Sequence, residues 1–548
     1  MTETPPSPGA NWSDDDFRKA GLAALILITI FVCYFSHLGA LGLTGPDEPR
    51  YVWIARDMAE SGDWVTPRLY GRPWFEKPIL YYWSAAASFK LFGVSETAAR
   101  LPSALYALLA TLSLAWLAIR LDGWETARWV LLFLPSCVAM IGFSHAASPD
   151  MPFTAMLTVA MVCGASVLGV APSRDEIDKA DTKPSRSPAL FLFGTALGAA
   201  VLAKGPAALV LAGGAILIWS GITGSWRVAL RVFRPVAVGA FLLTSVPWYI
   251  LCARRNPDFL RVFIVEHNFR RYLTPEFQHL QPFWYYLPVS IAALLPWVAW
   301  LAWFALRESR SHENPPRRSQ LVFIAAWAIF PLLFFSLSKS KLPGYILPAI
   351  PALIYLAVTA AVRSVHSKTT FSRYGLGASG IFFLACACAV VLSKTAGSLV
   401  LVFVFVAALG ALTIIFLAMM RQCRIGLLTA VVVQLFLLTL VYVSAAKLDS
   451  GLSARSTVAR IVPALRPRTY SYKLQRAWLY QCDFYLHREL LEWRPAIEGD
   501  AVVITPAKYL ENLKAQVEIV SVVSELSPQA VVLTVRPSAH PTSGGQPR

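Results

Sequence analysis

Acidic side chains lie directly beside long apolar runs at two places in this sequence. Asp47 and Glu48 follow the run that ends near residue 43, and Asp150 precedes the run that begins at residue 151. Ionisable groups at the edge of an apolar layer are costly and tend to be functional. A carboxylate there can act as a base toward a hydroxyl or hold a cationic group of a substrate. We therefore take Asp47, Glu48 and Asp150 as candidate catalytic residues.

Basic and hydroxyl-bearing side chains accompany these acids, in the same kind of position. Arginine binds phosphate bidentately and lysine binds it as a point charge, so a few acids ringed by cations suit a phosphate-bearing substrate. A simple cation pump would instead need acids within the apolar runs themselves. The predicted phosphate-binding and substrate-binding residues are Arg50, Tyr51, Lys77, Lys204, Arg270, Lys341 and Tyr345.

Several of these residues have a plainer alternative role. Asp47 could serve as the N-terminal charge of the helix that follows it, and Asp150 could cap the next helix. Arg50 and Lys77 could be cations that extend toward the membrane surface, and Arg270 is one of five arginines in its segment. The aromatic residues around them, such as Trp74, could form an ordinary interfacial belt.

Composition shows what kind of molecule must position these residues. The chain has 548 residues, of which 56% are hydrophobic and 15% charged, and its mean hydropathy is +0.53. Soluble domains carry about 25% charged residues, so an ordinary cytosolic enzyme, a disordered chain and a small disulfide scaffold are excluded. The net charge of +17 would suggest nucleic acid in a soluble protein. Beside long apolar runs it indicates a membrane protein with basic loops and anionic ligands.

Apolar runs long enough to cross a bilayer recur along the chain, since about 20 residues in a helix span its core. We predict about 13 transmembrane helices. Their approximate bounds are 21–43, 100–119, 127–146, 151–171, 189–203, 207–221, 235–252, 282–306, 320–338, 344–362, 375–393, 397–420 and 427–446.

The short basic loops set the predicted orientation. With residues 1–20 in the cytoplasm, every even-numbered connection is cytoplasmic and basic. The long basic loops 44–99 and 253–281 then lie outside, together with every candidate site residue. Two stretches of the first loop, from Pro49 and from Pro78 through Phe92, are predicted to form amphipathic helices along the membrane surface.

The chain changes character after the last apolar run. We divide it into a transmembrane domain over 21–446 and a soluble α/β domain over 447–548. Strands are predicted at 501–505, 517–523 and 530–535, and Thr505-Pro506 is predicted to open a helix that runs through Lys514. Residues 11–20 and the tail after Pro537 are expected to be disordered.

Four motifs carry a resemblance to a known family. They are Asp47-Glu-Pro-Arg-Tyr51, Gly62-Asp-Trp-Val-Thr-Pro-Arg68, Trp74-Phe-Glu-Lys-Pro78 and Ser338-Lys-Ser-Lys-Leu-Pro-Gly-Tyr-Ile-Leu-Pro348. Together they resemble the lipid A aminoarabinose transferases, which are bacterial inner-membrane enzymes of the GT-C superfamily related to protein O-mannosyltransferases. The helical pattern and the terminal domain extend the resemblance over nearly the whole chain.

The resemblance implies a fold, a reaction and a location. It implies a GT-C membrane fold in the inner membrane, with the active site and the C-terminal domain in the periplasm. The implied reaction moves 4-amino-4-deoxy-L-arabinose from undecaprenyl phosphate to a phosphate of lipid A, with inversion, and gives resistance to polymyxin. The sequence agrees in having no Gly-rich phosphate loop, so neither a nucleotide nor nucleic acid is an expected partner.

A metal site and two rival functions stay open at this point. The family is thought to carry zinc where the two long outer loops meet, which would use Glu76 and His267; a salt bridge of Glu76 and a plain surface histidine are the alternatives. No cofactor is required with certainty. The rivals are a GT-C transferase with another sugar or a hydroxyl acceptor, for which Asp47 would be the base, and a lipid transporter. A transporter is disfavoured because the chain lacks internal symmetry and acids within its runs.

Overall fold

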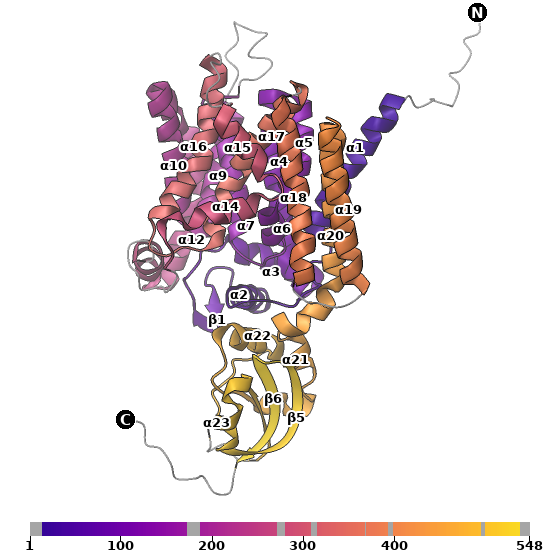
Figure 1. The fold of residues 1–548 in the computed structure, drawn as a ribbon. Helices are drawn as coiled ribbons and strands as arrows, with labels where there is room; N and C mark the ends of the chain where they lie inside the picture. Colours follow the sequence, from indigo (N-terminus) through magenta and orange to yellow (C-terminus); the bar gives the residue numbers. More distant parts are fainter. Residues whose placement is uncertain are drawn as a thin grey trace, which may run out of the picture.

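The protein is described here from a computed structural model. It covers residues 14–171, 187–270, 280–307, 315–367, 369–392, 398–494 and 499–537. Helices form the body of the molecule, and a small domain that contains a sheet lies below it in the view of Figure 1.

The helical body is built from long helices that run side by side, with shorter helical segments between some of them (Figure 1). In chain order they are α1 (Asp14–Ile30), η1 (Phe31–Phe35), α4 (Glu96–Asp122), α5 (Trp124–Ser136), α6 (Val138–Ser144), α7 (Asp150–Val167), α9 (Ser187–Lys204), α10 (Ala207–Thr223), α11 (Trp226–Ala229), η2 (Leu230–Phe233), α12 (Pro235–Arg255), η3 (Arg261–Arg270), η5 (Phe283–Tyr285), α14 (Tyr286–Leu294), α15 (Val298–Arg307), α16 (Pro315–Leu337), η7 (Pro343–Ala349), α17 (Ile350–His366), α18 (Thr370–Leu392), α19 (Ser398–Met419) and α20 (Cys423–Leu452).

Ten helices in the described part of the chain are long and apolar enough to cross a membrane. The bent pair α5 and α6, which meet at 61° where Cys137 adopts an extended backbone, makes an eleventh span if it counts as one. The protein is therefore a multi-pass membrane protein. The predicted runs 207–221 and 282–306 are occupied by shorter helices, so the helices match all thirteen predicted runs while the count of thirteen spans stays a prediction.

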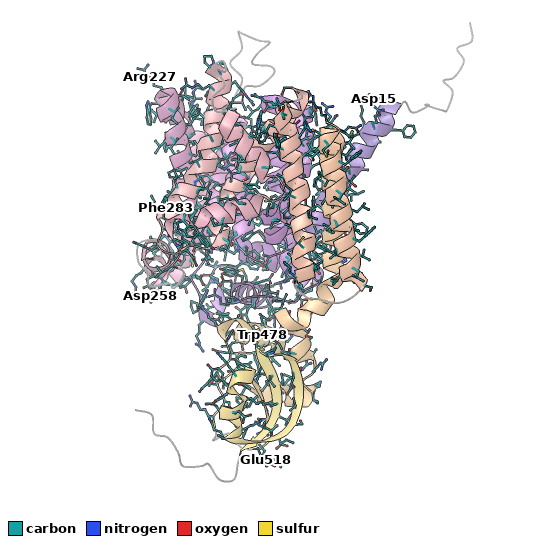
Figure 2. All side chains as sticks on the ribbon, viewed as in Figure 1. Asp15, Arg227, Asp258, Phe283, Trp478 and Glu518 are labelled. Atoms are coloured by element: carbon teal, nitrogen blue, oxygen red, sulfur yellow. The ribbon has the colours of Figure 1, made fainter. Side chains whose placement is uncertain are left out.

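The two ends of the helical body differ in what they carry. Asp15 and Arg227 lie at one end, whereas Asp258 lies at the other, together with Trp478 and Glu518 of the C-terminal domain (Figure 2). We call this second end the C-domain face. Arg227, from a basic even-numbered connection, and Asp258, from the long loop 253–281, therefore lie at opposite ends, as the sequence predicts.

Two short helices lie between the helical body and the C-terminal domain (Figure 1). They are α2 (Asp47–Ser61) and α3 (Leu80–Phe92), and β1 (Arg68–Leu69) and β2 (Arg72–Pro73) form a hairpin between them. Helix α2 buries Tyr51, Ile54, Ala55 and Met58, which recur with helical spacing on one face. The two helices predicted in this loop are present. Their placement along the membrane surface stays a prediction.

The C-terminal domain pairs a four-stranded sheet with short helices. Its sheet order is β3-β4-β6-β5, parallel between the first two strands and antiparallel elsewhere. The elements are α21 (Arg455–Ala459), η8 (Pro463–Arg468), β3 (Thr469–Ser471), α22 (Arg476–Leu486), β4 (Ala501–Thr505), η9 (Ala507–Tyr509), α23 (Leu510–Lys514), β5 (Val517–Ser527) and β6 (Ala530–Pro537).

The structure confirms some of the local predictions and corrects others. The three predicted strands are present, while β3 and α22 were not predicted. The predicted cap at Thr505 is wrong: Thr505 ends β4, and the helical segment begins as a 3₁₀ turn after Pro506. Residues 14–20 are helical, with a Lys19–Asp15 ion pair at 2.6 Å, because the polar start of α1 simply extends its first span. Residues 11–13 and the tail after Pro537 lie outside the described residues.

Candidate active site

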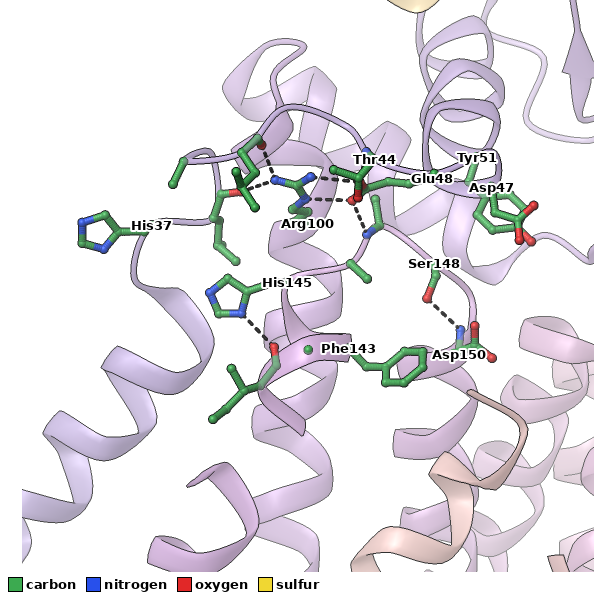
Figure 3. A pocket seen from close by; sticks show the side chains of 18 of the residues that line it. His37, Thr44, Asp47, Glu48, Tyr51, Arg100, Phe143, His145, Ser148 and Asp150 are labelled. Carbon is green, nitrogen blue, oxygen red and sulfur yellow. Dashed lines mark hydrogen bonds and ion pairs between the residues drawn. The ribbon is translucent and has the colours of Figure 1, made fainter. Parts of the chain in front are cut away.

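A cavity of about 550 Å³ lies in the helical body at its C-domain face. Its wall comes from segments far apart in the chain: the start of α2, the loop before α3, the ends of α6 and α9, the start of α7, and η7 with α20. Seven of the predicted site residues line it: Asp47, Glu48, Tyr51, Lys77, Asp150, Lys204 and Tyr345. Figure 3 shows Asp47 and Asp150 on one side of this cavity.

Arg50 organises the acids at the start of α2. Its side chain is only 3% exposed, and its guanidinium binds Asp47 through one nitrogen and the Glu76 carboxylate, at 2.8 Å, through another. Lys77 contacts the other carboxylate oxygen of Glu76 at 3.3 Å. Arg50 does not line the cavity itself; it holds Asp47, whose side chain is 52% exposed, at the cavity wall. Asp47 can therefore act as the N-terminal charge of α2, but it also forms a specific ion pair with Arg50.

Glu48 faces away from solvent into a buried network. Its carboxylate accepts hydrogen bonds from Arg100 at 2.7 and 2.9 Å and from the backbone N–H groups of Thr44 and Ala147. Burial alone would raise the pKa of Glu48, but Arg100 beside it and these hydrogen bonds lower it. Removing one member of such a pair is costly because the other is left buried and charged. Glu48 thus fixes the backbone on both sides of the cavity.

Arg100 is a site residue that the sequence reasoning missed. It also donates to the carbonyl oxygens of Leu38, Leu41 and Gly42, so it ties the end of the first span to α2. The sequence offered one signal for it: a charged residue begins the predicted run 100–119, and acidic residues follow the preceding run. Sequence alone did not show that Glu48 would be its partner.

Asp150 and Lys204 meet at the cavity wall from different helices. Asp150 begins α7 and Lys204 ends α9, and the two form an ion pair. The Lys204 ammonium also lies 4.8 Å from the centre of the Tyr345 ring and 5.6 Å from that of Phe153. Three predicted residues from three separate segments therefore meet at one point.

Lys341 lies in the same loop as Tyr345 but plays a different part. Its ammonium donates to the carbonyl oxygens of Gln281 at 3.0 Å and Ser338 at 2.6 Å, and the residue is buried outside the cavity wall. Desolvation, with Lys339 nearby, lowers its pKa. These contacts brace the loop that carries Tyr345.

The predicted metal ligands are not brought together by the described side chains. The side chains of His267 and Arg270 lie outside the described residues. Both oxygens of Glu76 face cations, and among the described residues no group of three or more His, Cys, Asp or Glu could hold a metal ion. The described donor set around Glu76 does not fit zinc, and the zinc site stays a prediction.

The opposite end of the cavity is aromatic and apolar, and its polar members were also missed. Tyr442 of α20 stacks with His37 at 5.3 Å and with His145 at 5.2 Å between ring centres, and its hydroxyl lies 3.0 Å from Nε2 of His145. Figure 3 places His37 and His145 away from Asp47 and Asp150. One cavity thus joins an ionic end to an end lined by aromatic and aliphatic side chains.

This arrangement can bind an amphipathic anion. Each of the four cations near the cavity is paired with an acid. An entering phosphate can therefore replace the carboxylate at Lys77 or Lys204, and the cation is not left buried without a partner. The freed acids can in turn hold a cationic group or accept a proton.

Comparisons with known proteins agree with this geometry. Residues 22–263 match the family described as dolichyl-phosphate-mannose-protein mannosyltransferase. Two relatives named undecaprenyl phosphate-alpha-4-amino-4-deoxy-L-arabinose arabinosyl transferase are 32% identical over 377 residues (Enterobacter sp. strain 638) and 34% identical over 381 residues (Serratia proteamaculans strain 568). Each match covers 68% of this chain and 65% of the relative, so the chain matches just under two thirds of their length.

A solved structure shows the same fold over nearly the whole chain. The crystal structure of ArnT from Cupriavidus metallidurans bound to undecaprenyl phosphate superposes with a TM-score of 0.77 at 24% identity, covering 94% of this chain and 98% of that one. The predicted membrane all-α fold with a C-terminal α/β domain is therefore confirmed. The chain therefore shares the fold of ArnT and is similar in sequence to the two arabinosyl transferases.

Proposed function

We propose that this protein is an inverting, polyprenyl-phosphate-dependent glycosyltransferase. It moves 4-amino-4-deoxy-L-arabinose from undecaprenyl phosphate to a phosphate of lipid A, at the periplasmic side of the bacterial inner membrane. The observation that carries the proposal is the meeting of Asp47, Lys77, Asp150, Lys204 and Tyr345 in one cavity at the C-domain face. The names of the related transferases support the donor and the sugar.

The donor's leaving group is a phosphate monoester anion that needs charge neutralisation rather than a general acid. The bond from its oxygen to the anomeric carbon breaks, and an oxygen of the acceptor phosphate forms a new bond to that carbon from the opposite face. Lys77 and Lys204 are placed to bind the departing phosphate, with the Tyr345 hydroxyl as a donor. One cation about 4 Å from a phosphate is worth about 4 kcal/mol at an effective dielectric constant of about 20.

The acceptor phosphate is already ionised, so it requires no general base. Asp47 and Asp150 then hold the ammonium of the amino sugar and orient the acceptor. The pairing of Asp47 with Arg50 holds that carboxylate at the cavity wall. Both carboxylate oxygens of Glu76 face cations, Arg50 and Lys77.

A transferase with a hydroxyl acceptor is the second candidate. The match of residues 22–263 to the protein mannosyltransferase family favours it. In that reaction Asp47, half exposed at the cavity wall, would take the proton of the attacking hydroxyl.

The test is reconstitution of the purified protein with the lipid-linked amino sugar and lipid A. We expect undecaprenyl phosphate and modified lipid A to appear in equal amounts, with both lost in Asp47→Asn and in Lys77→Ala. Replacing lipid A with peptide or glycan acceptors distinguishes the second candidate. Donor turnover that needs such an acceptor, with no change in lipid A, would overturn the first.

A further inference from the structure

Helix α22 joins the C-terminal domain to the site as well as to its own sheet. Phe484 belongs to the same buried cluster as Tyr51 and Phe75, and Tyr480 packs against that cluster. On its other side, Trp478 and Cys482 belong to the core beneath the sheet. One helix thus serves two cores.

Several polar contacts fix α22 and its flanks against the first outer loop. Tyr70 donates to the Asp483 carboxylate at 2.5 Å, and the Leu43 N–H donates to the Tyr485 hydroxyl at 2.8 Å. These contacts join α22 to the start and the middle of the loop, which holds α22 beside α2.

Tyr480 is the α22 residue that reaches Arg50. Its ring centre lies 5.5 Å from the Arg50 guanidinium carbon, close to the corresponding 5.6 Å for Trp74 and 5.8 Å for Tyr51. Arg50 is therefore surrounded by aromatic rings, and Tyr480 is the one among them that comes from the C-terminal domain. A guanidinium within about 6 Å of a ring is attracted to the face of its π system.

We propose that Tyr480 is a positioning residue for the transfer reaction: the C-terminal domain completes the active site by fixing Arg50, and through it Asp47 and Glu76. Tyr480 touches no substrate in this scheme. The inference rests on the proposed function, since Arg50 matters only if Asp47 does. It assigns to the C-terminal domain a part in catalysis that its fold does not suggest.

The test measures kcat and KM for lipid-linked donor with Tyr480→Leu and Tyr480→Phe. Loss of the ring should lower kcat about threefold to thirtyfold, from the size of a cation–π contact, with a smaller change in KM. Tyr480→Phe keeps the ring and should restore the wild-type rate. Tyr470→Leu is the matched control: Tyr470 packs on Trp493 within the sheet domain, 5.8 Å between ring centres, and should leave kcat unchanged.

A double-mutant cycle separates positioning from general destabilisation. In an Arg50→Gln background, Tyr480→Leu should change kcat less than twofold, because its route to Asp47 is already cut. Equal effects in both backgrounds, or a wild-type rate for Tyr480→Leu, would overturn the inference while leaving the function in place. A wild-type protein that transfers no sugar would overturn both.

Discussion

At the scale of single residues, the site is a set of cations each held by an acid. Lys204 pairs with Asp150, and Arg50 pairs with Asp47 and Glu76, so these charges are already partnered in the described structure before substrate arrives. In the proposed reaction, phosphate binding at Lys204 would be an exchange of partners that leaves no buried charge unpaired. The cations would then have two roles, one in the empty site and one in turnover.

Lys204→Ala should lower the transfer rate at least about a hundredfold, because the charge that faces the departing phosphate is lost. Lys90→Ala provides the control, since Lys90 is exposed at the end of α3 and lies outside the cavity wall. Rates of donor turnover measured on both purified variants check this. A Lys204→Ala enzyme within threefold of Lys90→Ala would remove Lys204 from the site.

Residue types indicated which side chains gather at the cavity, but they did not indicate how these pair. Seven of the twelve predicted residues line it. They could be picked out because polar residues beside an apolar run are rare enough to be informative. Glu48 was predicted as catalytic but is held by Arg100, and Lys341 braces a loop. Helix packing decides which acid meets which cation. Glu48 and Arg100 are 52 residues apart in the sequence, so no local pattern encodes their pairing.

At the scale of elements, the segment 338–349 packs closely against the start of α7. A Cβ at Gly344 would lie 2.9 Å from the Phe143 ring and 3.2 Å from Cγ of Asp150. The backbone of this loop therefore packs against the carboxylate that pairs with Lys204. Glycine is needed here for close approach.

Gly344→Ala should push Asp150 away from Lys204 and lower kcat about tenfold or more, since small displacements of a positioned group are costly. Gly377→Ala is its control, because a Cβ at Gly377 meets nothing within 4 Å. Thermal unfolding in detergent should be nearly equal for the two variants. Equal kcat values would show that the loop does not position Asp150.

The junction of α22 with the first outer loop should respond to pH. Burial of Asp483 raises the pKa of its carboxyl from 3.8 to about 7, against the hydrogen bond from Tyr70 that lowers it. The folded state therefore binds this proton more tightly than the unfolded state. Its contribution to stability is fully present below about pH 4 and is lost as the pH rises through 7.

Wild-type protein should thus lose up to about 4 kcal/mol of stability between pH 4 and pH 8 from this group, at 1.4 kcal/mol per pKa unit. Asp483→Asn should flatten that part of the curve. Asp500→Asn should not, because Arg536 lowers the pKa of the exposed Asp500 carboxyl below this range. Unfolding temperatures across pH measure both, and parallel curves for wild type and Asp483→Asn would refute the assignment.

At the scale of the whole molecule, the predicted site residues with described side chains all lie toward the C-domain face. The spans could be predicted because their hydrophobicity is local, and the strands because their runs are bounded by turn residues. The docking of the C-terminal domain onto α2 could not, since it depends on pairs such as Tyr70 and Asp483, which are 413 residues apart.

Orientation can be read directly by labelling. In a background with the exposed Cys388 replaced by serine, Lys508→Cys should react with an impermeant maleimide added to intact spheroplasts. Arg227→Cys lies at the opposite end of the molecule (Figure 2). It should react only after lysis, because the proposed orientation puts the C-domain face in the periplasm. The reverse pattern would invert the topology.

The proposed sugar transfer is tested most directly by mass spectrometry of lipid A. The strain should be polymyxin-sensitive, lack its own transferase and express this chain. We predict a mass increase of one aminoarabinose on the phosphorylated disaccharide, together with polymyxin resistance, and the loss of both in Asp47→Asn at equal membrane abundance. Unmodified lipid A in cells that hold the wild-type protein in the membrane and make the lipid-linked sugar would contradict the proposed transfer.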